Sequence, residues 1–138
     1  TFSEGFVPVQ TIPALIADAD VGVIPLRISG GTDIMLPTKL LEYVRVGIPC
    51  IVPRTGTICR YFDDEMVAFF DAEDVQSLAA TMVALQSDFA RRKRIVDSAT
   101  ARFGRKYSWD RHKLVYTGLV ERLLRGEPGR LNPSADAP

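Results

Sequence analysis

The chain has 138 residues, of which 46% are hydrophobic and 25% are charged, and its Lys/Arg and Asp/Glu totals are equal. These proportions are typical of a globular domain with a real core, so they exclude a disordered chain, and the apolar runs are too short to cross a bilayer. Two cysteines and one histidine are too few for a disulfide framework or a Cys/His metal site. The first residues do not form a signal peptide, and because the chain starts without Met we expect a processed product or a fragment.

The first part of the chain alternates helical and strand-like segments. Buried strands are expected at three short apolar runs, residues 21–26, 48–53 and 66–70. Helices are expected before and between these strands, at residues 13–19, 37–46 and 58–62. Gly47 is placed to end the 37–46 helix. This alternation predicts an α/β fold with a parallel sheet whose two faces are both covered.

The rest of the chain is expected to be helical at the carboxy-terminal end. Asp74 caps a first expected helix, in which Val75, Leu78, Ala79, Met82, Val83 and Leu85 carry the helical period. A second expected helix covers residues 89–106, and Ser108 caps a third, with Val115, Leu119, Val120 and Leu123 on one side. Gly, Pro, Asn and Ser dominate residues 126–138, which we expect to form a disordered tail after a domain of residues 1–125.

Charge is divided unevenly along the chain. Residues 1–90 hold 5 Lys/Arg against 12 Asp/Glu, whereas residues 91–130 hold 12 against 4. A basic region of this kind could attract phosphates, anionic lipid or nucleic acid. The favoured interpretation is a solvated helical face, or charge that meets the acidic half of the same molecule.

Loop 27–36 and the start of the 37–46 helix form the candidate ligand site, because open parallel sheets bind ligands beyond the carboxyl ends of their strands. Pro37 suits the first helical position and Leu36 is a poor cap. The N–H groups of Thr38 and Lys39, together with the helix dipole, then form an anion site. Their side chains add a hydroxyl and a cation.

Glu42 follows Thr38 by four residues, so both side chains point to one side of the helix. A carboxylate one turn below a phosphate site can accept hydrogen bonds from sugar hydroxyls, which suggests a nucleotide or a nucleotide-sugar. The alternative is an ordinary helix on which Glu42 pairs with Arg45, and the residues alone leave both open. The chain has no Walker A loop and no Gly-x-Gly-x-x-Gly sequence, and a Ser/His/Asp hydrolase is disfavoured.

Five segments occur in an order and spacing that resemble the nucleotide-binding domain of retaining GT-B glycosyltransferases of the family 4 type. They are GFVP at residues 5–8, residues 12–25, LPTKLLEY at residues 36–43, GIP at residues 47–49 and YSW at residues 107–109. The resemblance covers roughly residues 2–125 and implies a Rossmann-like sheet, as part of a GT-B C-terminal domain.

The resemblance also implies roles for residues of the site. Glu42 matches the second glutamate of a paired motif, which binds the nucleotide ribose. Thr38 and its neighbours Leu36, Pro37 and Lys39 match the segment that meets the donor diphosphate. The first glutamate of the motif falls on Ile34 here, so the adjacent Asp33 is the candidate catalytic carboxylate. Loop 27–36 would lie near the transferred sugar.

The implied function is transfer of a glycosyl group, such as a hexosyl group, from a nucleotide-sugar donor to an unknown acceptor with retention. The acceptor could be a sugar, a lipid-linked sugar or a small molecule, and no cofactor or metal is required. The family also needs an N-terminal acceptor domain, which we expect to be missing from this chain, so we expect the chain alone to be inactive. We expect a cytoplasmic location, leave open a peripheral contact with the inner face of the membrane, and disfavour nucleic acid as a partner.

Two other classes of function stay open at this point. One is a non-catalytic module that binds a nucleotide or phosphate. The other is a basic interaction domain that docks on anionic membrane or nucleic acid through residues 91–125.

Overall fold

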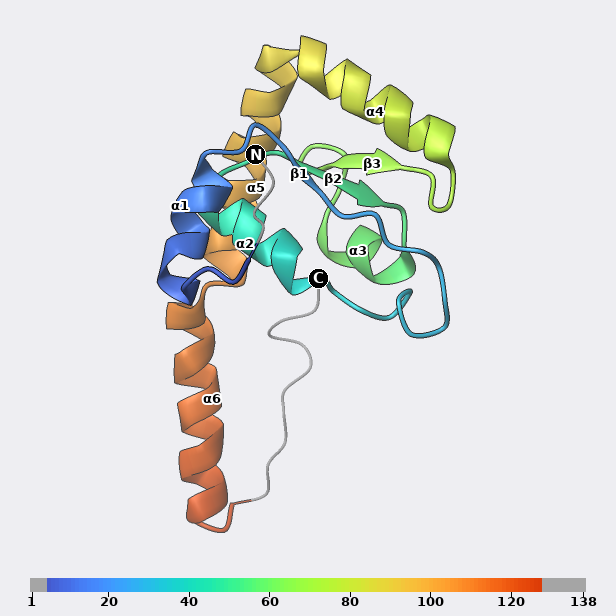
Figure 1. The fold of residues 1–138 in the computed structure, drawn as a ribbon. Helices are drawn as coiled ribbons and strands as arrows, with labels where there is room; N and C mark the ends of the chain where they lie inside the picture. Colours follow the sequence, from blue (N-terminus) through green and yellow to red (C-terminus); the bar gives the residue numbers. More distant parts are fainter. Residues whose placement is uncertain (1–4, 128–138) are drawn as a thin grey trace.

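Three parallel strands in the order β1-β2-β3 form the sheet of the computed structural model, which describes residues 5–127 (Figure 1). The strands are β1 (Gly22–Val23), β2 (Cys50–Pro53) and β3 (Ala68–Phe70). Gly22 lies opposite Cys50, and Ile51 lies opposite Ala68. The predicted α/β fold with a parallel sheet is therefore confirmed, and it is Rossmann-like. Each observed strand is shorter than its apolar run, because β2 and β3 leave out the first two residues of their runs and β1 contains only Gly22 and Val23.

The helices follow the predicted order along the chain. They are the 3-10 turn η1 (Val9–Thr11) and the α-helices α1 (Ile12–Ala17), α2 (Thr38–Val46), α3 (Gly56–Tyr61), α4 (Val75–Ser87), α5 (Phe89–Lys106) and α6 (Trp109–Leu124). Gly47 ends α2 with φ 88°, in the left-handed region that glycine adopts without strain. Asp74 caps α4, as predicted, through bonds to the first N–H groups of that helix.

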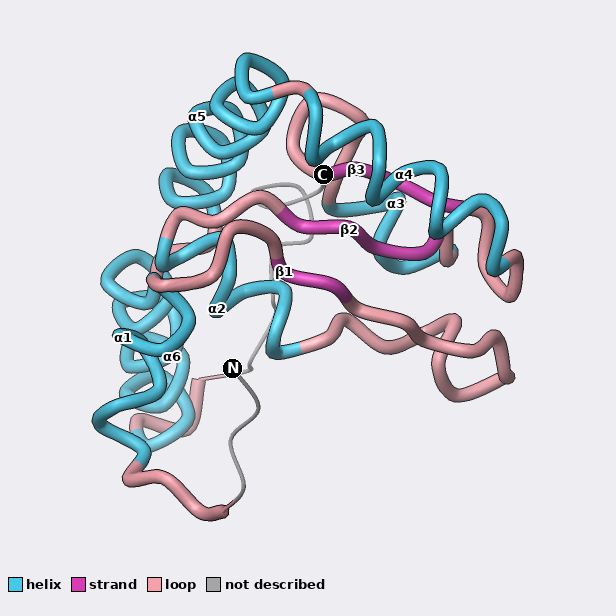
Figure 2. The backbone as a smooth tube through the Cα atoms, turned by 45° about the horizontal axis from the view of Figure 1, so that its top comes forward, coloured by secondary structure: helices cyan, strands magenta, loops and turns pink. Residues whose placement is uncertain are grey.

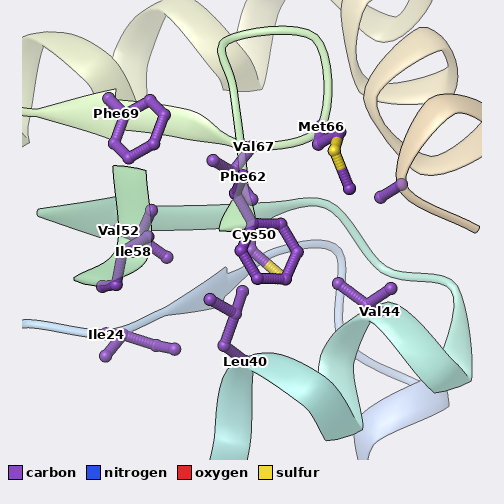
Figure 3. Packing of buried hydrophobic residues seen from close by; sticks show 11 residues of the cluster. Ile24, Leu40, Val44, Cys50, Val52, Ile58, Phe62, Met66, Val67 and Phe69 are labelled. Atoms are coloured by element: carbon purple, nitrogen blue, oxygen red, sulfur yellow. The ribbon is translucent and has the colours of Figure 1, made fainter. Parts of the chain in front are cut away.

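Side chains alternate between two apolar clusters, one on each face of the sheet. Figure 3 shows the first cluster, in which Leu40 and Val44 of α2 point toward Cys50 and Val52 of β2, with Phe62 beside them. The second cluster joins Ile51, Ala68 and Phe70 to Leu85 and Ile95, which come from α4 and α5. Both faces are therefore covered by helices, and Figure 2 shows α2 and α4 on opposite sides of the strands.

Helix α5 passes the amino-terminal end of the sheet. Its residue Ile95 belongs to the cluster under α4, and Ala99 one turn later belongs to the cluster under α2. A Cβ on Gly47, which precedes β2, would lie 3.9 Å from the side chain of Val96. This placement leaves the carboxyl ends of the strands free, and α2, α3 and α4 all begin at that edge (Figure 1).

Two helices bury less apolar surface than their sequence pattern predicts. In α4 only Leu85 is fully buried, and Val75, Met82 and Val83 are exposed. Helix α6 extends away from the sheet, contains no buried residue, and has no side-chain bond from its cap residue Ser108 (Figure 1). None of the described helices is long and apolar enough to cross a membrane. Most of the expected tail, residues 128–138, lies outside the described residues.

Candidate functional site

Three helices begin at the carboxyl edge of the sheet, and their first turns differ. In α3, the hydroxyl of Thr55 accepts a hydrogen bond from the Ile58 N–H at 3.4 Å. In α4, one oxygen of Asp74 accepts from two N–H groups of the first turn, at 2.8 and 3.0 Å. In α2, the cap position is Pro37, and no side chain bonds to the first turn. At this edge of the described structure, α2 is thus the helix whose N-terminus is left open.

The start of α2 lies one residue later than predicted. Pro37 has φ −65° and ψ 127°, which is extended backbone, so it is the cap residue and the helix begins at Thr38. The cap position therefore belongs to Pro37 rather than to Leu36. Pro37 is buried and Leu36 is half-buried against the core. The first turn of α2 still lacks a side-chain acceptor, as expected, because neither the proline nor the leucine side chain can accept a hydrogen bond.

Thr38, Lys39 and Glu42 are all exposed on α2. Thr38 and Glu42 are four residues apart on the same side of the helix, so a ligand at the open end could contact both. The alternative pairing of Glu42 with Arg45 does not form among the described ion pairs. Glu42 is therefore available to a ligand rather than bound within its own helix.

Asp33 is bonded to the start of α3. Its Oδ1 accepts a hydrogen bond from the Gly56 N–H at 2.8 Å, and its backbone carbonyl accepts from the Thr57 N–H at 3.1 Å. Gly56 was not among the residues expected at the site. The available signal was Thr55, a good cap residue three positions before the apolar Ile58, which marks a helix start earlier than the one expected.

Tyr43 holds α2 against β1. A Cβ added to Gly22 would stand 2.3 to 2.8 Å from three ring atoms of Tyr43, so the ring lies directly on the glycine. Burial raises the pKa of Tyr43, and negative charge on Cys50 and Glu42 acts in the same direction. The close approach fixes how far α2 stands from the sheet, and so it also fixes the position of the helix N-terminus.

A hollow of about 380 Å³ opens at the same edge of the sheet, on the α4 side. It is lined by Arg27 from the loop after β1, by Phe70 at the end of β3, and by Glu73 in the turn that leads into α4. The hollow was not predicted from the sequence, because its walls come from segments more than 40 residues apart. Among the described residues, no group of three or more His, Cys, Asp or Glu side chains is arranged to hold a metal ion.

Several cations of α5 are paired within the molecule. Arg102 forms ion pairs with Asp63 at 2.7 Å and with Glu65 at 2.9 Å. Lys93 pairs with Asp97, and Arg92 donates to two carbonyl groups at the end of α4. The charge asymmetry is thus partly explained by contact with the acidic half of the chain, the interpretation favoured from the sequence.

These features define a Rossmann-like α/β domain whose carboxyl edge offers an open helix N-terminus, an arrangement suited to an anionic ligand. The family described as Glycosyl transferases group 1 matches residues 3–88, and the chain therefore belongs to that family. The match spans the three strands and ends after α4, so α5 and α6 lie outside it. A comparison with curated proteins found no match. Membership of the family indicates glycosyl transfer in general.

Proposed function

We propose that this chain is the donor-binding part of a retaining glycosyltransferase of the family 4 type, which moves a glycosyl group from a nucleotide-sugar to an acceptor. One observation carries the proposal. The first turns of α3 and α4 are bonded by side chains of this molecule, whereas the first turn of α2 is not. Its open N–H groups lie at the edge where a parallel α/β sheet binds its ligand.

The donor diphosphate is proposed to bind at the N-terminus of α2. The N–H groups of Thr38 and Lys39 have no side-chain acceptor in the described structure, and Pro37 has no N–H to offer. Both residues are exposed, so the Thr38 hydroxyl and the Lys39 ammonium can also reach an anion there. The positive end of the helix dipole adds to this attraction.

Glu42 is proposed to bind the ribose. It is exposed, it forms no ion pair with Arg45 in the described part of the chain, and it lies one turn below Thr38. A carboxylate can accept two hydrogen bonds from neighbouring hydroxyl groups, which is how acidic residues grip a ribose in other Rossmann-like sites. The diphosphate and the ribose hydroxyl groups of the donor would then bind on the same side of α2.

The chemistry that this arrangement supports is electrostatic. When the bond between the sugar and the diphosphate breaks, negative charge grows on the departing diphosphate. N–H groups and a cation that are already in place stabilise that charge without moving, and this lowers the barrier. The acceptor, whether a sugar, a lipid-linked sugar or a small molecule, would be held by a separate acceptor domain.

The test is donor affinity in the intact protein, measured by calorimetry with UDP, GDP and ADP as separate probes. Glu42→Ala is expected to weaken binding of the preferred nucleotide about tenfold, the effect of losing hydrogen bonds to a charged group. Glu121→Ala removes another exposed carboxylate, from α6, and is the matched control. Unchanged affinity in Glu42→Ala would remove the ribose assignment, and the absence of any binding by the wild type would remove the proposed function.

The alternative of a basic docking domain receives less support. Three of the basic side chains of α5 are already engaged with acidic side chains or carbonyl groups. The family match covers the sheet rather than the basic helices. Both observations favour the hypothesis that the chain is part of a glycosyltransferase.

A further inference from the structure

Loop 27–36 is folded on itself and fastened to the rest of the molecule at one residue. Within the loop, the Thr32 hydroxyl donates to the Arg27 carbonyl at 2.6 Å and accepts from the Ser29 N–H at 2.7 Å. Among the described residues, the two hydrogen bonds that join this loop to another element both end on Asp33. They reach across 23 and 24 positions of sequence to Gly56 and Thr57, the first two residues of α3.

We propose that Asp33 is a positioning residue. It fastens loop 27–36 to the first turn of α3, and this keeps the N-terminus of α2 open and correctly placed to bind the donor. This inference rests on the proposed function, because it concerns the same donor site. It differs from the catalytic role that the resemblance implies for Asp33, which stays a prediction. In this structure, Oδ1 of Asp33 accepts a hydrogen bond from the backbone N–H of Gly56.

The bond matters because Asp33 is close in sequence to the start of α2. Only Ile34 and Met35, both exposed, separate Asp33 from Leu36 and the buried Pro37. Leu36 packs on the core and Thr38 starts α2. The segment is thus held at Asp33 on one side and at Leu36 and Pro37 on the other. Without the side-chain bond of Asp33, only the backbone bond from Thr57 would join this loop to α3, and a looser loop would have to be ordered again whenever donor binds.

Charge gives a second reason for this placement. A free carboxylate next to the start of α2 would repel a diphosphate. At α3, the same carboxylate faces an N–H group at the positive end of another helix, where negative charge is favourable. The bond to Gly56 therefore orders the loop and directs its acid toward α3.

The hydrogen bond between Gly56 and Asp33 can be removed by a substitution at either residue. Asp33→Ala removes the acceptor, whereas Asp33→Asn keeps an oxygen that can still accept from Gly56. Gly56→Pro removes the donor, and proline suits the first position of a helix. The extended backbone of Thr55, with φ −107° and ψ 157°, is compatible with a following proline. Gly56→Ala keeps the N–H and is the matched control, since its Cβ would be 3.2 Å from Asp33 Oδ2, which the end of a flexible side chain can accommodate.

The experiment measures affinity for UDP, GDP and ADP in the intact protein, with thermal unfolding of each variant as a check that it is folded. We expect Asp33→Ala and Gly56→Pro each to weaken the preferred nucleotide about tenfold, a cost of about 1.4 kcal/mol. The double variant should be no worse than either single one, because the two changes break one bond. Asp33→Asn and Gly56→Ala should bind within about threefold of the wild type.

A different pattern overturns the inference while leaving the proposed function intact. If Asp33→Asn loses as much affinity as Asp33→Ala, the charge itself acts on the donor and Asp33 is not a positioning residue. If Gly56→Pro binds as the wild type does, the bond to α3 has no effect on the site. If Asp33→Ala only lowers the unfolding temperature and binds normally, the role is structural alone. Failure of the proposed function looks different, since the wild type itself would then bind none of the three nucleotides.

Discussion

The aromatic ring of Tyr43 lies directly on the backbone of Gly22, so that a Cβ at position 22 would stand 2.3 Å from Cδ2 of the ring. The contact joins the helix that carries the candidate site to the first strand. The ring atoms nearest the glycine include Cγ, at the base of the side chain, which a small rotation of the far end of the ring cannot move away. The sequence places a glycine in an apolar strand, and the structure supplies the reason for it.

Gly22→Ala is therefore expected to destabilise the protein by about 1–3 kcal/mol, the usual cost of overpacking a core. Urea unfolding of the two proteins measures the change. Gly118→Ala is the control, because no atom lies within 4 Å of its Cβ position and it is inside α6. That change should stabilise by about 0.5–1 kcal/mol, since alanine is the better helix residue. Equal effects of the two substitutions would contradict the contact.

Alkaline pH is expected to weaken the fold through Cys50. Burial raises the pKa of this thiol to about 12 in the folded protein, whereas an unfolded cysteine titrates near about 8.5. Below about pH 8.5 both states carry the proton, and between that pH and 12 only the folded state does, so stability falls as pH rises through this window. From pH 8 to pH 10 the loss should be about 2 kcal/mol.

Urea unfolding at the two pH values tests this expectation. Cys50→Ala should be less stable than the wild type at pH 8, because it leaves a small cavity, yet it should lose less on going to pH 10. Cys59→Ala, which changes the exposed thiol, is the matched control and should lose as much as the wild type. The same loss in all three proteins would show that other groups cause the alkaline dependence.

The two thiols are also expected to differ in reactivity. Cys59 is exposed on α3, while Cys50 is only 1% exposed between the sheet and α2. Titration of the native protein with Ellman's reagent should show one fast thiol, and a second should react at the rate of unfolding. Cys59→Ser should abolish the fast phase. Two fast thiols in the native wild type would mean that the cluster around Cys50 opens readily.

Glu73 is strained in the turn between β3 and α4. Its φ is 66°, in the left-handed region that side chains with a Cβ rarely adopt. Glu73→Gly should raise the free energy of unfolding by about 0.5–1 kcal/mol, because relief of this strain exceeds the entropy cost of glycine. Glu121→Gly, the same change in the last turn of α6, should lower it by about 0.5–1 kcal/mol. Thermal unfolding of both variants shows whether the stability rises in the first and falls in the second.

Elements governed by short-range patterns were predictable from the sequence. The bounds expected for α5, residues 89–106, agree with the structure, and so do the cap at Asp74 and the left-handed Gly47. These features depend on residues within one or two turns of each other. The parallel sheet follows from the same kind of evidence, because short apolar runs separated by helices have few other ways to be buried on two faces.

The exposed face of α2 with Thr38 and Glu42 was also predictable, since a helical spacing of four residues sets it. The start of the helix was one residue off, because only the ψ of Pro37 decides between cap and first turn. The assignment of Thr38, Lys39 and Glu42 to a donor stays a prediction.

Local sequence patterns alone establish that this chain is an α/β domain with an uncapped helix at the carboxyl edge of its sheet. The packing of distant segments decides that Asp33 bonds to Gly56, that Arg102 pairs with the 63–65 turn, and that the apolar side of α6 stays exposed. The physical reason is that periodicity shows which side of a segment is apolar or charged, whereas its partner depends on how segments many residues apart pack together.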